Sequence, residues 1–494
     1  MKTRPEALCL APLAACISSL FGLATATPLW ASTTHTINSC DDGASAAATP
    51  GTLRYEITHA APTDAVNVTA IPAVCGTSYI TLYSGEIPVT QSTLAIYGSG
   101  KEAIRTIFGR VFKHSGTGTL SISDLTIESG EYLSSYSNKN ADGGCIYSAG
   151  SVTLTNTSVI DCLAWLYKPG SGSPQARGGA IFAKANVTLT NSNVSGNVAD
   201  AVYDSLASPE FETIGGGIYA ASVTASYSTI SGNSASAQEG SLGGGVFTTG
   251  SLSATHSTIA HNLASSVQAS VSRGGGAYVG GSLTLISSTV SNNRAAITGG
   301  IIQSGSGFYC TITNSTISGN VSYIQIGGMN LSSSAAISNS TIVFNKGAGV
   351  GGVFASGPSL TLRSSIFADN QGSGATDLVV LGVPTISGEA NLVMSTTNAS
   401  PPPGVITLSS EPHLAPLANH GGPTLTHALL PNSPAIAAGS NPGNYPYDQR
   451  GPGFDRTLSI PPPAALTWTD IGAYQRQLVD DEIFYDGFGP LPGG

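Results

Sequence analysis

The stretch GGGIYAASVTASYSTISGN, residues 215–233, decides the fold, because the chain repeats its pattern downstream. A second copy, GGGVFTTGSLSATHSTIAHN, spans 243–262, and a third, GGGAYVGGSLTLISSTVSNN, spans 274–293. Self-similarity at a period of roughly 20–50 residues is typical of solenoids, in which each copy is one structural unit stacked on the next. Less regular copies begin at Gly143, Gly178, Gly299, Gly327 and Gly351.

Within each copy, apolar and polar residues alternate, as in SLTLISSTV at 282–290. This period of two predicts β-strands. The Ile or Val near the end of each copy recurs every 24 to 36 residues. The shortest of these spacings fits three strands of ~5 residues and three turns. We therefore predict an all-β, right-handed parallel β-helix in which each coil hydrogen-bonds to the next.

Each copy ends in an asparagine, which would stack on the asparagine of the next coil. Side-chain amides carry both donors and an acceptor, so a column of them can bond along the solenoid. We interpret these residues as a structural ladder and not as catalytic groups. The ladder residues are Asn197, Asn233, Asn262, Asn293, Asn320, Asn345 and Asn370.

The N-terminus has the features of an export signal. A basic start, an apolar stretch and the small-residue sequence Ala24-Thr25-Ala26 predict a secretory signal peptide over residues 1–26. Leu13-Ala14-Ala15-Cys16 resembles a lipobox, so acylation of Cys16 is the alternative. No later stretch has the length of an apolar transmembrane helix. We expect a secreted or outer-surface protein of bacterial type.

The repeats divide the remaining chain. Residues 35–130 should form an N-terminal cap and first irregular coils, with an amphipathic helix at 51–61 that places Leu53, Ile57 and Ala60 or Ala61 on one face. Residues 131–379 should be the regular coils. Residues 380–475 are expected to form an irregular domain that closes the other end, and 476–494 a flexible tail.

Composition limits the partners. Charged residues are 9 % of the chain and the net charge is −10, which argues against nucleic acid as a partner. In an oxidising compartment Cys40–Cys75 and Cys145–Cys162 are plausible disulfides, although other pairings stay open. Cys310 would be a buried thiol. No His/Cys spacing indicates a metal site.

Three segments resemble a known family. The GG-small-Ile-Tyr and STISGN phrases resemble the polymorphic-outer-membrane-protein-type repeats of bacterial parallel β-helix proteins in the pectin-lyase-like superfamily. CDDG and GTLRYEI, within 40–57, are similar to the N-terminal region of many such secreted proteins. LAPLANHGGPTLTHALLPNSPAIAAGS at 414–440, DQRG at 448–451 and DIGAYQ at 470–475 resemble a choice-of-anchor Q domain. The resemblance implies the fold and a surface or secreted location, and no agreed activity.

Long insertions precede several copies, at 131–142, 161–178 and 197–215. Insertions at one corner of a solenoid form a wall that often binds a ligand. We therefore expect a non-enzymatic surface or adhesion protein whose loop wall binds a polysaccharide or a cell-surface partner; the oligomeric state is left open. The expected binding residues are Tyr132, Tyr136, Trp165, Tyr167, Tyr203, Glu210 and Glu212.

The alternative is a polysaccharide lyase or glycoside hydrolase that acts on an extended, acidic polysaccharide. Such chemistry needs carboxylates, or calcium held by them, close to a basic group. We expect no cofactor, and calcium only under this alternative. The catalytic candidates in the wall are Asp161, Asp200, Asp204 and Arg177.

An aromatic column follows the glycine pairs. Facing outward, its rings would lie under sugars; facing inward, they would be core, which is the interpretation we favour. His256 and His261 have no counterparts in neighbouring copies, and a polar surface role is expected for both. The column residues are Tyr147, Phe182, Tyr219, Phe247 and Tyr278.

Overall fold

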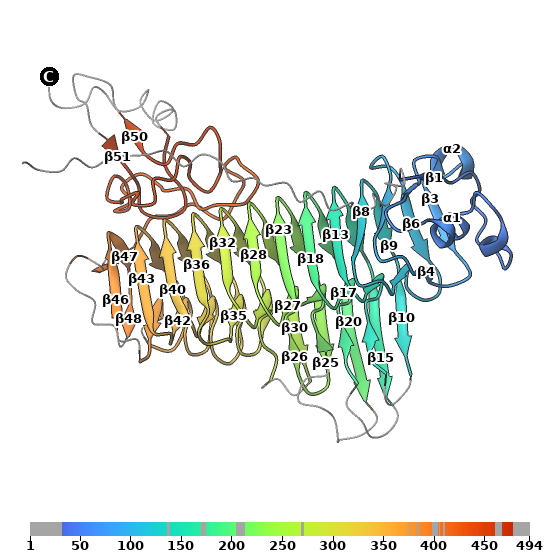
Figure 1. Ribbon diagram of the computed structural model, residues 1–494. Coiled ribbons are helices and arrows are strands. Elements are labelled where there is room, and N and C mark those ends of the chain that lie inside the picture. The colour runs from blue at the N-terminus through green and yellow to red at the C-terminus, as the bar shows by residue number, and fades with distance from the viewer. Residues whose placement is uncertain are drawn as a thin grey trace, which may run out of the picture. The chain divides into compact units, whose positions relative to one another are not determined.

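Short parallel strands, stacked in long sheets, make up almost the whole structure (Figure 1). This computed structural model describes residues 32–135, 139–168, 174–203, 213–267, 271–374, 376–382, 385–397, 404, 406–408, 411–459 and 467–477. The described residues from Thr33 onward belong to one compact unit. Strands that neighbour in space come from successive copies of the repeat, which is the topology of a parallel β-helix. The fold prediction is confirmed; the handedness of the coil stays a prediction.

One coil shows how the five sheets arise. It runs from β18 (Asn186–Thr190) in sheet I through β19 (Asn193–Ser195) in sheet II to β20 (Val198–Tyr203) in sheet III. It returns through β21 (Thr213–Ile214) in sheet IV and β22 (Ile218–Ala220) in sheet V. Each strand pairs in parallel with its counterpart in the next coil.

The sheets differ in length along the solenoid. Sheets I and II have 13 strands each, sheet V has 12, sheet III has 7 and sheet IV has 4. Sheets III and IV therefore accompany only part of the solenoid. Sheet I runs from β1 (Thr34–Thr36) to β46 (Thr385–Glu389), sheet II from β3 (Tyr79–Leu82) to β49 (Ile406–Leu408), and sheet V from β4 (Ile87–Val89) to β48 (Thr396–Thr397).

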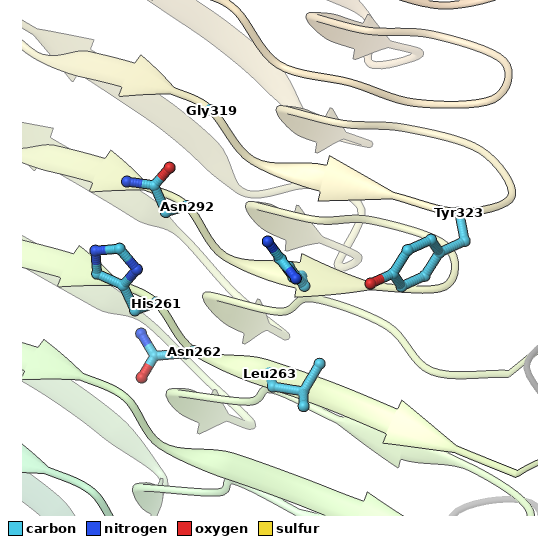
Figure 2. A pocket seen from close by; sticks show the side chains of 7 residues that line it. His261, Asn262, Leu263, Asn292, Gly319 and Tyr323 are labelled. Carbon is cyan, nitrogen blue, oxygen red and sulfur yellow. The ribbon is translucent and has the colours of Figure 1, made fainter.

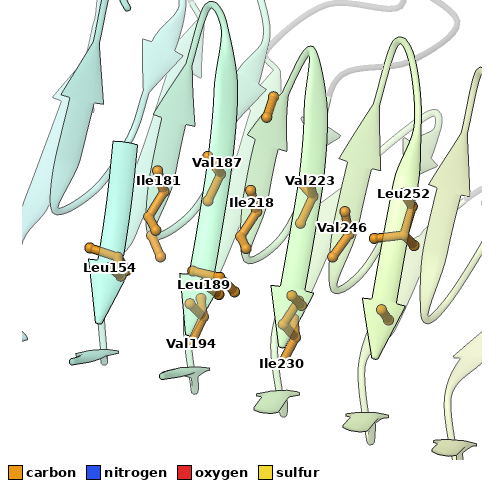
Figure 3. Packing of buried hydrophobic residues seen from close by; sticks show 14 of the residues in the cluster. Leu154, Ile181, Val187, Leu189, Val194, Ile218, Val223, Ile230, Val246 and Leu252 are labelled. Carbon is orange, nitrogen blue, oxygen red and sulfur yellow. The ribbon is translucent and has the colours of Figure 1, made fainter. Parts of the chain in front are cut away.

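The core lies inside the coil. Parallel register places each interior side chain on its equivalent in the next coil, as in Val194, Ile230 and Ile259 of sheet II. These residues, like Val187 and Val223 of sheet I, are almost fully buried (Figure 3). Burying one such side chain stabilises the fold by about 1.5–3 kcal/mol, so the repeated column is the main stabilising feature.

The asparagines form one continuous ladder inside the turn between sheets II and III. Asn197 donates from Nδ2 to Asn233 Oδ1 at 2.8 Å, and Asn233 donates in the same way to Asn262 at 3.0 Å. The pattern continues to Asn370, whose Nδ2 donates to Asp377 Oδ1 at 2.9 Å. All of these side chains are buried, and every amide points the same way along the solenoid.

The ladder explains the third glycine of each GGG. A Cβ added to Gly217 would lie 2.9 Å from Asn233 Cγ, and one added to Gly245 would lie 2.9 Å from Asn262 Cγ. The asparagine thus occupies the space in which a side chain of the glycine would sit. At the head of the ladder Cys162 donates its N–H to Asn197 Oδ1, in the backbone position that asparagine takes in later coils.

Both expected disulfides are confirmed. Cys40 bonds to Cys75 in the N-terminal region, and Cys145 bonds to Cys162 at the head of the asparagine ladder. Cys310 is free and fully buried on sheet I. Burial raises the pKa of its thiol to about 12, so this group is an inert part of the core.

Two short helices cover the N-terminal end, α1 (Leu53–His59) and α2 (Ile71–Cys75). Leu53, Ile57 and Ala60 are buried, which confirms the expected amphipathic helix. Thr52 accepts the Tyr55 N–H and caps α1. No helix among the described residues combines the length and apolar character needed to cross a membrane.

The C-terminal segment lies beside the solenoid, which differs from the expected closure of its end (Figure 1). Strands β46 to β49 still extend the sheets, and residues 411–459 and 467–477 then contact the outer face of sheet II. Gln449 accepts a hydrogen bond from Thr316 Oγ1 at 2.6 Å. The outer face of sheet II carries Ser195 and Ser231 in early coils but Val343 and Ile366 in late ones. These apolar residues pack against the segment, and their need for cover explains its position.

Removing one rung of the asparagine ladder should destabilise the protein. Asn262→Ala removes the Nδ2 group that donates to the Ile230 carbonyl and to Asn293 Oδ1. It also removes the Oδ1 atom that accepts from the backbone N–H and Nδ2 of Asn233, which leaves that buried backbone N–H without its acceptor. We expect the free energy of unfolding to fall by about 2–4 kcal/mol, measured by denaturant titration. The exposed Asn186→Ala on sheet I is the control and should change it by less than about 0.5 kcal/mol. An equal effect of both substitutions would contradict the structural role of the ladder.

The N-terminal cap should weaken as pH rises through the titration of His35. His35 contacts Glu56 Oε2 at 2.9 Å and Asp64 Oδ2 at 3.1 Å. Burial lowers the pKa of His35, but the hydrogen bonds and charges of the two carboxylates outweigh it and raise the pKa above 6.5. Protonated His35 therefore stabilises the folded state fully below about pH 6.5, and this stability is lost as pH rises through the higher folded pKa.

The thermal midpoint of the N-terminal region should therefore decrease as the pH is raised from about 6 to about 9. Hydrogen exchange of the amides in this region monitors the transition. His35→Gln removes the titrating group and should flatten this dependence. An unchanged slope in the variant would show that another group is responsible.

Candidate functional site

The expected loop wall is a two-layered projection made of sheets III and IV. The layers meet through small apolar side chains, among them Ala164, Leu166 and Ala199 of sheet III and Ala141 and Ala176 of sheet IV. Figure 1 shows the long strands of sheet III extending beyond the rest of the coil. Sheet III is β10 (Glu131–Ser134), β15 (Leu163–Lys168), β20, β25 (Ser234–Ala237), β30 (Leu263–Ser266), β34 (Arg294–Ala295) and β38 (Val321–Ser322). Sheet IV is β11 (Ala141–Asp142), β16 (Ala176–Arg177), β21 and β26 (Ser241–Leu242).

Several expected site residues lie outside what the structure describes. They are Tyr136, Asp204, Glu210 and Glu212, together with the side chain of Tyr203. Their roles stay predictions.

Asp161 is a turn residue. It has a φ of 53° between β14 (Ser158–Ile160) and β15, and Gly196 and Gly232 follow it at the same turn with φ of 69° and 64°. This left-handed conformation suits glycine, asparagine and aspartate. The positive φ required at this turn position is therefore a structural reason for an aspartate at position 161. Across the described ranges, no three His, Cys, Asp or Glu side chains converge in a way that could hold a metal ion.

Arg177 and Tyr132 belong to a packed ionic network at the corner of sheets IV and V. Arg177 forms a two-pronged ion pair with Asp142, at 2.7 and 2.8 Å, and its guanidinium lies 4.6 Å from the Phe182 ring centroid. Arg110 lies 3.3 Å from the Tyr132 ring centroid and donates to the Asp142 carbonyl. Burial alone would lower the pKa of Arg177, but the hydrogen bonds and the charge of Asp142 have the larger effect. The pKa of Arg177 is therefore raised above its ordinary value. Among the described residues, these groups are therefore paired with one another.

The aromatic column faces outward from sheet V, so the inward orientation that we favoured is wrong. Strand alternation gives the inward place to Ile146, Ile181 and Ile218, which are fully buried in the core inside the coil. The rings stack outside it, with centroids 4.9–5.4 Å apart and planes within 10–16°.

The stacking decides what the column can bind. Each ring covers the face of the next, and the ends of the column meet Arg110 beside Tyr147 and Ile302 beside Tyr278. Only ring edges remain for solvent, whereas a sugar stacks on a ring face. The column is therefore a packing feature, worth about 0.5–1.5 kcal/mol per ring pair beyond its buried area.

The outer face of sheet III presents aromatic groups differently. Trp165 and Tyr167 alternate with the buried Ala164 and Leu166, so they lie on the outer side of β15. Asp200 is the register partner of Trp165 in the next coil. Burial raises the pKa of Asp200 above 3.8, and a hydrogen bond from Ser236 opposes this shift.

The same face leads to a polar pocket of about 380 Å³ (Figure 2). Sheet III strands shorten from six residues in β20 to four in β30 and two in β34, which opens space beside the turn. Figure 2 shows the Tyr323 ring on one side of this space and His261 and Asn292 on the other. Arg294, on β34, also lines it.

Sequence reasoning did not identify this pocket. His261 and Asn292 occupy the left-handed turn position, with φ of 57° and 55°, where the coils before and after have Gly232 and Gly319. Arg294 stands in register with Leu263 and Val321. The signal was therefore a departure from the repeat in two columns, on either side of the asparagine ladder, which becomes visible only when the register is known.

Comparisons with known proteins identify no family for this chain. No family model matches it, and no curated protein matches it. Among solved structures it is similar to one described as "Crystal structure of pectate lyase Pel9A", with 15 % identity, a TM-score of 0.36, and coverage of 90 % of this chain and 96 % of that chain. Similarity at this level says nothing about activity, and the fold assignment depends on the sheets themselves. Membership of the repeat family and of the choice-of-anchor Q family stays a prediction.

If Arg177 is structural, its loss should lower stability. Arg177→Gln leaves Asp142 without its ion pair and uncovers Phe182, so we expect a loss of about 1–2 kcal/mol in the free energy of unfolding. The exposed Lys184→Gln is the matched control and should stay within about 0.5 kcal/mol. Loss of polysaccharide binding or cleavage with unchanged stability would instead assign Arg177 to a site.

Proposed function

We propose that the protein is a non-enzymatic, extracellular polysaccharide-binding protein, and that the polymer lies along the outer face of sheet III. The observation that carries this proposal is the continuity of that face with the polar pocket. Trp165 and Tyr167 mark one end, and Arg294 and Tyr323 mark the other.

The dimensions suit an extended chain. Five strand spacings separate β15 from β38, which is about 24 Å at ~4.8 Å per coil. A polymer that runs parallel to the solenoid axis would cross one strand of sheet III per coil, at a constant spacing between strands. Insertions of different length would leave this spacing unchanged, because the strands keep their parallel register in sheet III.

The chemistry of the face suits saccharides. Sugar rings combine an apolar C–H face with hydroxyl groups, and they are held by aromatic side chains together with a few fixed polar groups. Trp165 and Tyr323 supply the aromatic groups. His261, Asn292 and Arg294 supply donors and acceptors in the pocket.

An extracellular location is consistent with the two disulfides, because such bonds persist in oxidising compartments. The predicted signal peptide adds to this proposal. Surface attachment and adhesion remain part of the proposal.

The second candidate is cleavage of the bound polysaccharide. The observation that favours it is Asp200, a partly buried carboxyl group with a raised pKa beside Trp165 on the proposed binding face. Carboxyl groups of this kind serve as general acids in glycoside hydrolysis. Calcium would be needed only if the reaction were a lyase reaction.

Binding and cleavage can be separated with the purified protein. We expect neutral or acidic polysaccharides on a solid support to retain the protein, and Trp165→Ala with Tyr323→Ala to weaken retention about tenfold or more. Tyr309→Ala, an exposed tyrosine on sheet I, is the matched control and should bind normally.

The same samples are assayed for new reducing ends and for ultraviolet-absorbing unsaturated products, with and without calcium. Products that disappear in Asp200→Asn would replace the binding proposal by the enzymatic one. Retention of the double variant equal to that of the parent protein would overturn the assignment of the face.

A further inference from the structure

A second cleft lies on the other side of sheet II, away from the pocket of Figure 2. It has a volume of about 260 Å³ and lies between the turn after sheet I and the C-terminal segment. Tyr227, His256 and Asn314 line it from the turn, and Tyr445 and Tyr447 line it from the segment. It shares no lining residue with the first pocket.

Two of these residues have a left-handed backbone conformation, which is unusual for tyrosine and more common for histidine. Tyr227 and His256 have φ of 50° and 47°. The same turn position carries small polar residues in other coils, such as Asn191, Ser287 and Asn339. A left-handed conformation at a bulky residue costs on the order of 1–3 kcal/mol, and such residues gather at functional sites.

Packing does not explain the two rings. Tyr227 is 52 % exposed, so it buries little apolar area in return for its backbone conformation. The rings of Tyr227 and His256 stack on each other, with centroids 4.7 Å apart and planes at 18°. Unlike the five-ring column of sheet V, this pair ends after two rings, because its neighbours at the same turn position are Asn191 and Ser287. No further ring covers its outer faces, so the pair offers an aromatic surface at the mouth of the cleft.

The floor of the cleft has unmet hydrogen-bonding capacity. Asn314 is 4 % exposed; its Nδ2 donates to the Tyr447 carbonyl at 3.1 Å, but its Oδ1 has no hydrogen-bond partner among the described residues. The same holds within the described part of the chain for His256 Nδ1. Buried polar atoms are nearly always paired, so these two atoms are available to water or to the hydroxyl groups of a ligand. Asn339 Oδ1, in the same column of the next coil, is also without a partner among the described residues but does not line the cleft.

The lining carries no free charge that would select an ionic ligand. Asp448, at the edge of the cleft, is paired with Arg450 at 2.8 Å and accepts the Gln475 N–H. Burial lowers the pKa of His256 below 6.5, so its imidazole is neutral at pH 7. The remaining lining groups are tyrosines, prolines, Ile286, Ser287 and Gly451.

We propose that this cleft binds a ring of a neutral saccharide. The apolar face of the sugar lies on the Tyr227–His256 surface, and its hydroxyl groups reach toward Asn314 and His256. The volume is below the ~300 Å³ at which pockets for drug-sized ligands begin, so one or two rings fit better than a peptide segment. The site is independent of the sheet III face, since neither needs a residue of the other.

The test uses the full chain and three neutral disaccharides, namely cellobiose, maltose and lactose, in saturation-transfer NMR and calorimetry. At least one should bind, and Tyr227→Asn should weaken it about tenfold or more, equivalent to 1.4 kcal/mol. Asparagine suits the left-handed turn, so the thermal midpoint of this variant should stay equal to or above that of the parent protein. Tyr309→Ala, the exposed sheet I tyrosine that lines neither pocket, should bind the disaccharide normally. Tyr323→Ala, in the sheet III pocket, is measured in parallel to show which of the two sites holds the ligand.

Each other outcome overturns the proposal. No binding of any disaccharide, or equal binding by Tyr227→Asn, removes the cleft as a saccharide site. A lowered thermal midpoint in Tyr227→Asn shows that the aromatic pair is a packing feature. Loss of disaccharide binding in Tyr323→Ala, with Tyr227→Asn unaffected, moves the ligand to the sheet III face and leaves the proposed function standing.

Discussion

The asparagine ladder is the constraint on which the rest of the structure depends. Each amide donates to the next coil and accepts from the previous one, so every coil must return to the same point at a spacing of ~4.8 Å. The ladder begins at the Cys145–Cys162 disulfide and ends at Asp377, whose carboxyl oxygens accept from Asn370 and from the Ser395 hydroxyl. An acceptor is the required terminus, because the last amide points its N–H groups outward. Once this line is fixed, the sheets keep their register and the loops between them are free to vary in length.

Fixed register also determines which surfaces can recognise a ligand. Aromatic residues in one column stack face to face, as the rings of sheet V do. Each ring then covers the face of its neighbour, and no ring face inside the column is left to bind a ligand. A ring remains available only where its neighbours in the column differ from it. Trp165 lies between Leu133 and Asp200, and Tyr323 lies beside the two-residue strand β38. Aromatic residues that break a column are therefore better binding candidates than those that form one.

Much of the fold could be predicted from the sequence, because the residues that produce the periodic pattern are the same residues that form the core. The alternation around Val194 and Ile230, the recurrent asparagines and the amphipathic helix at Leu53 each describe a local preference that the structure satisfies. The orientation of the aromatic column could not be predicted, since the residues on both faces of sheet V are apolar. The position of the C-terminal segment is linked to Val343 and Ile366, two apolar residues in separate outer columns of sheet II where other coils carry serine or threonine. These replacements have no period and are visible only when the coils are aligned.

The fold is recognised from what the coils share, whereas the candidate sites are recognised from residues in which one coil differs from its neighbours. In a solenoid the neighbouring coils show what a position requires, so a costly departure needs a cause outside the repeat. Tyr227 takes a backbone conformation that asparagine or serine takes elsewhere in the same turn column at lower cost. The cleft beside Tyr227 is also lined by the C-terminal segment, through Tyr445 and Tyr447, whereas the sheet III pocket lies where the strands of sheet III become short. An exposed sheet that ends beside a covering segment leaves a concave edge. Ligand binding is expected at such an edge where its residues have no structural reason for their identity.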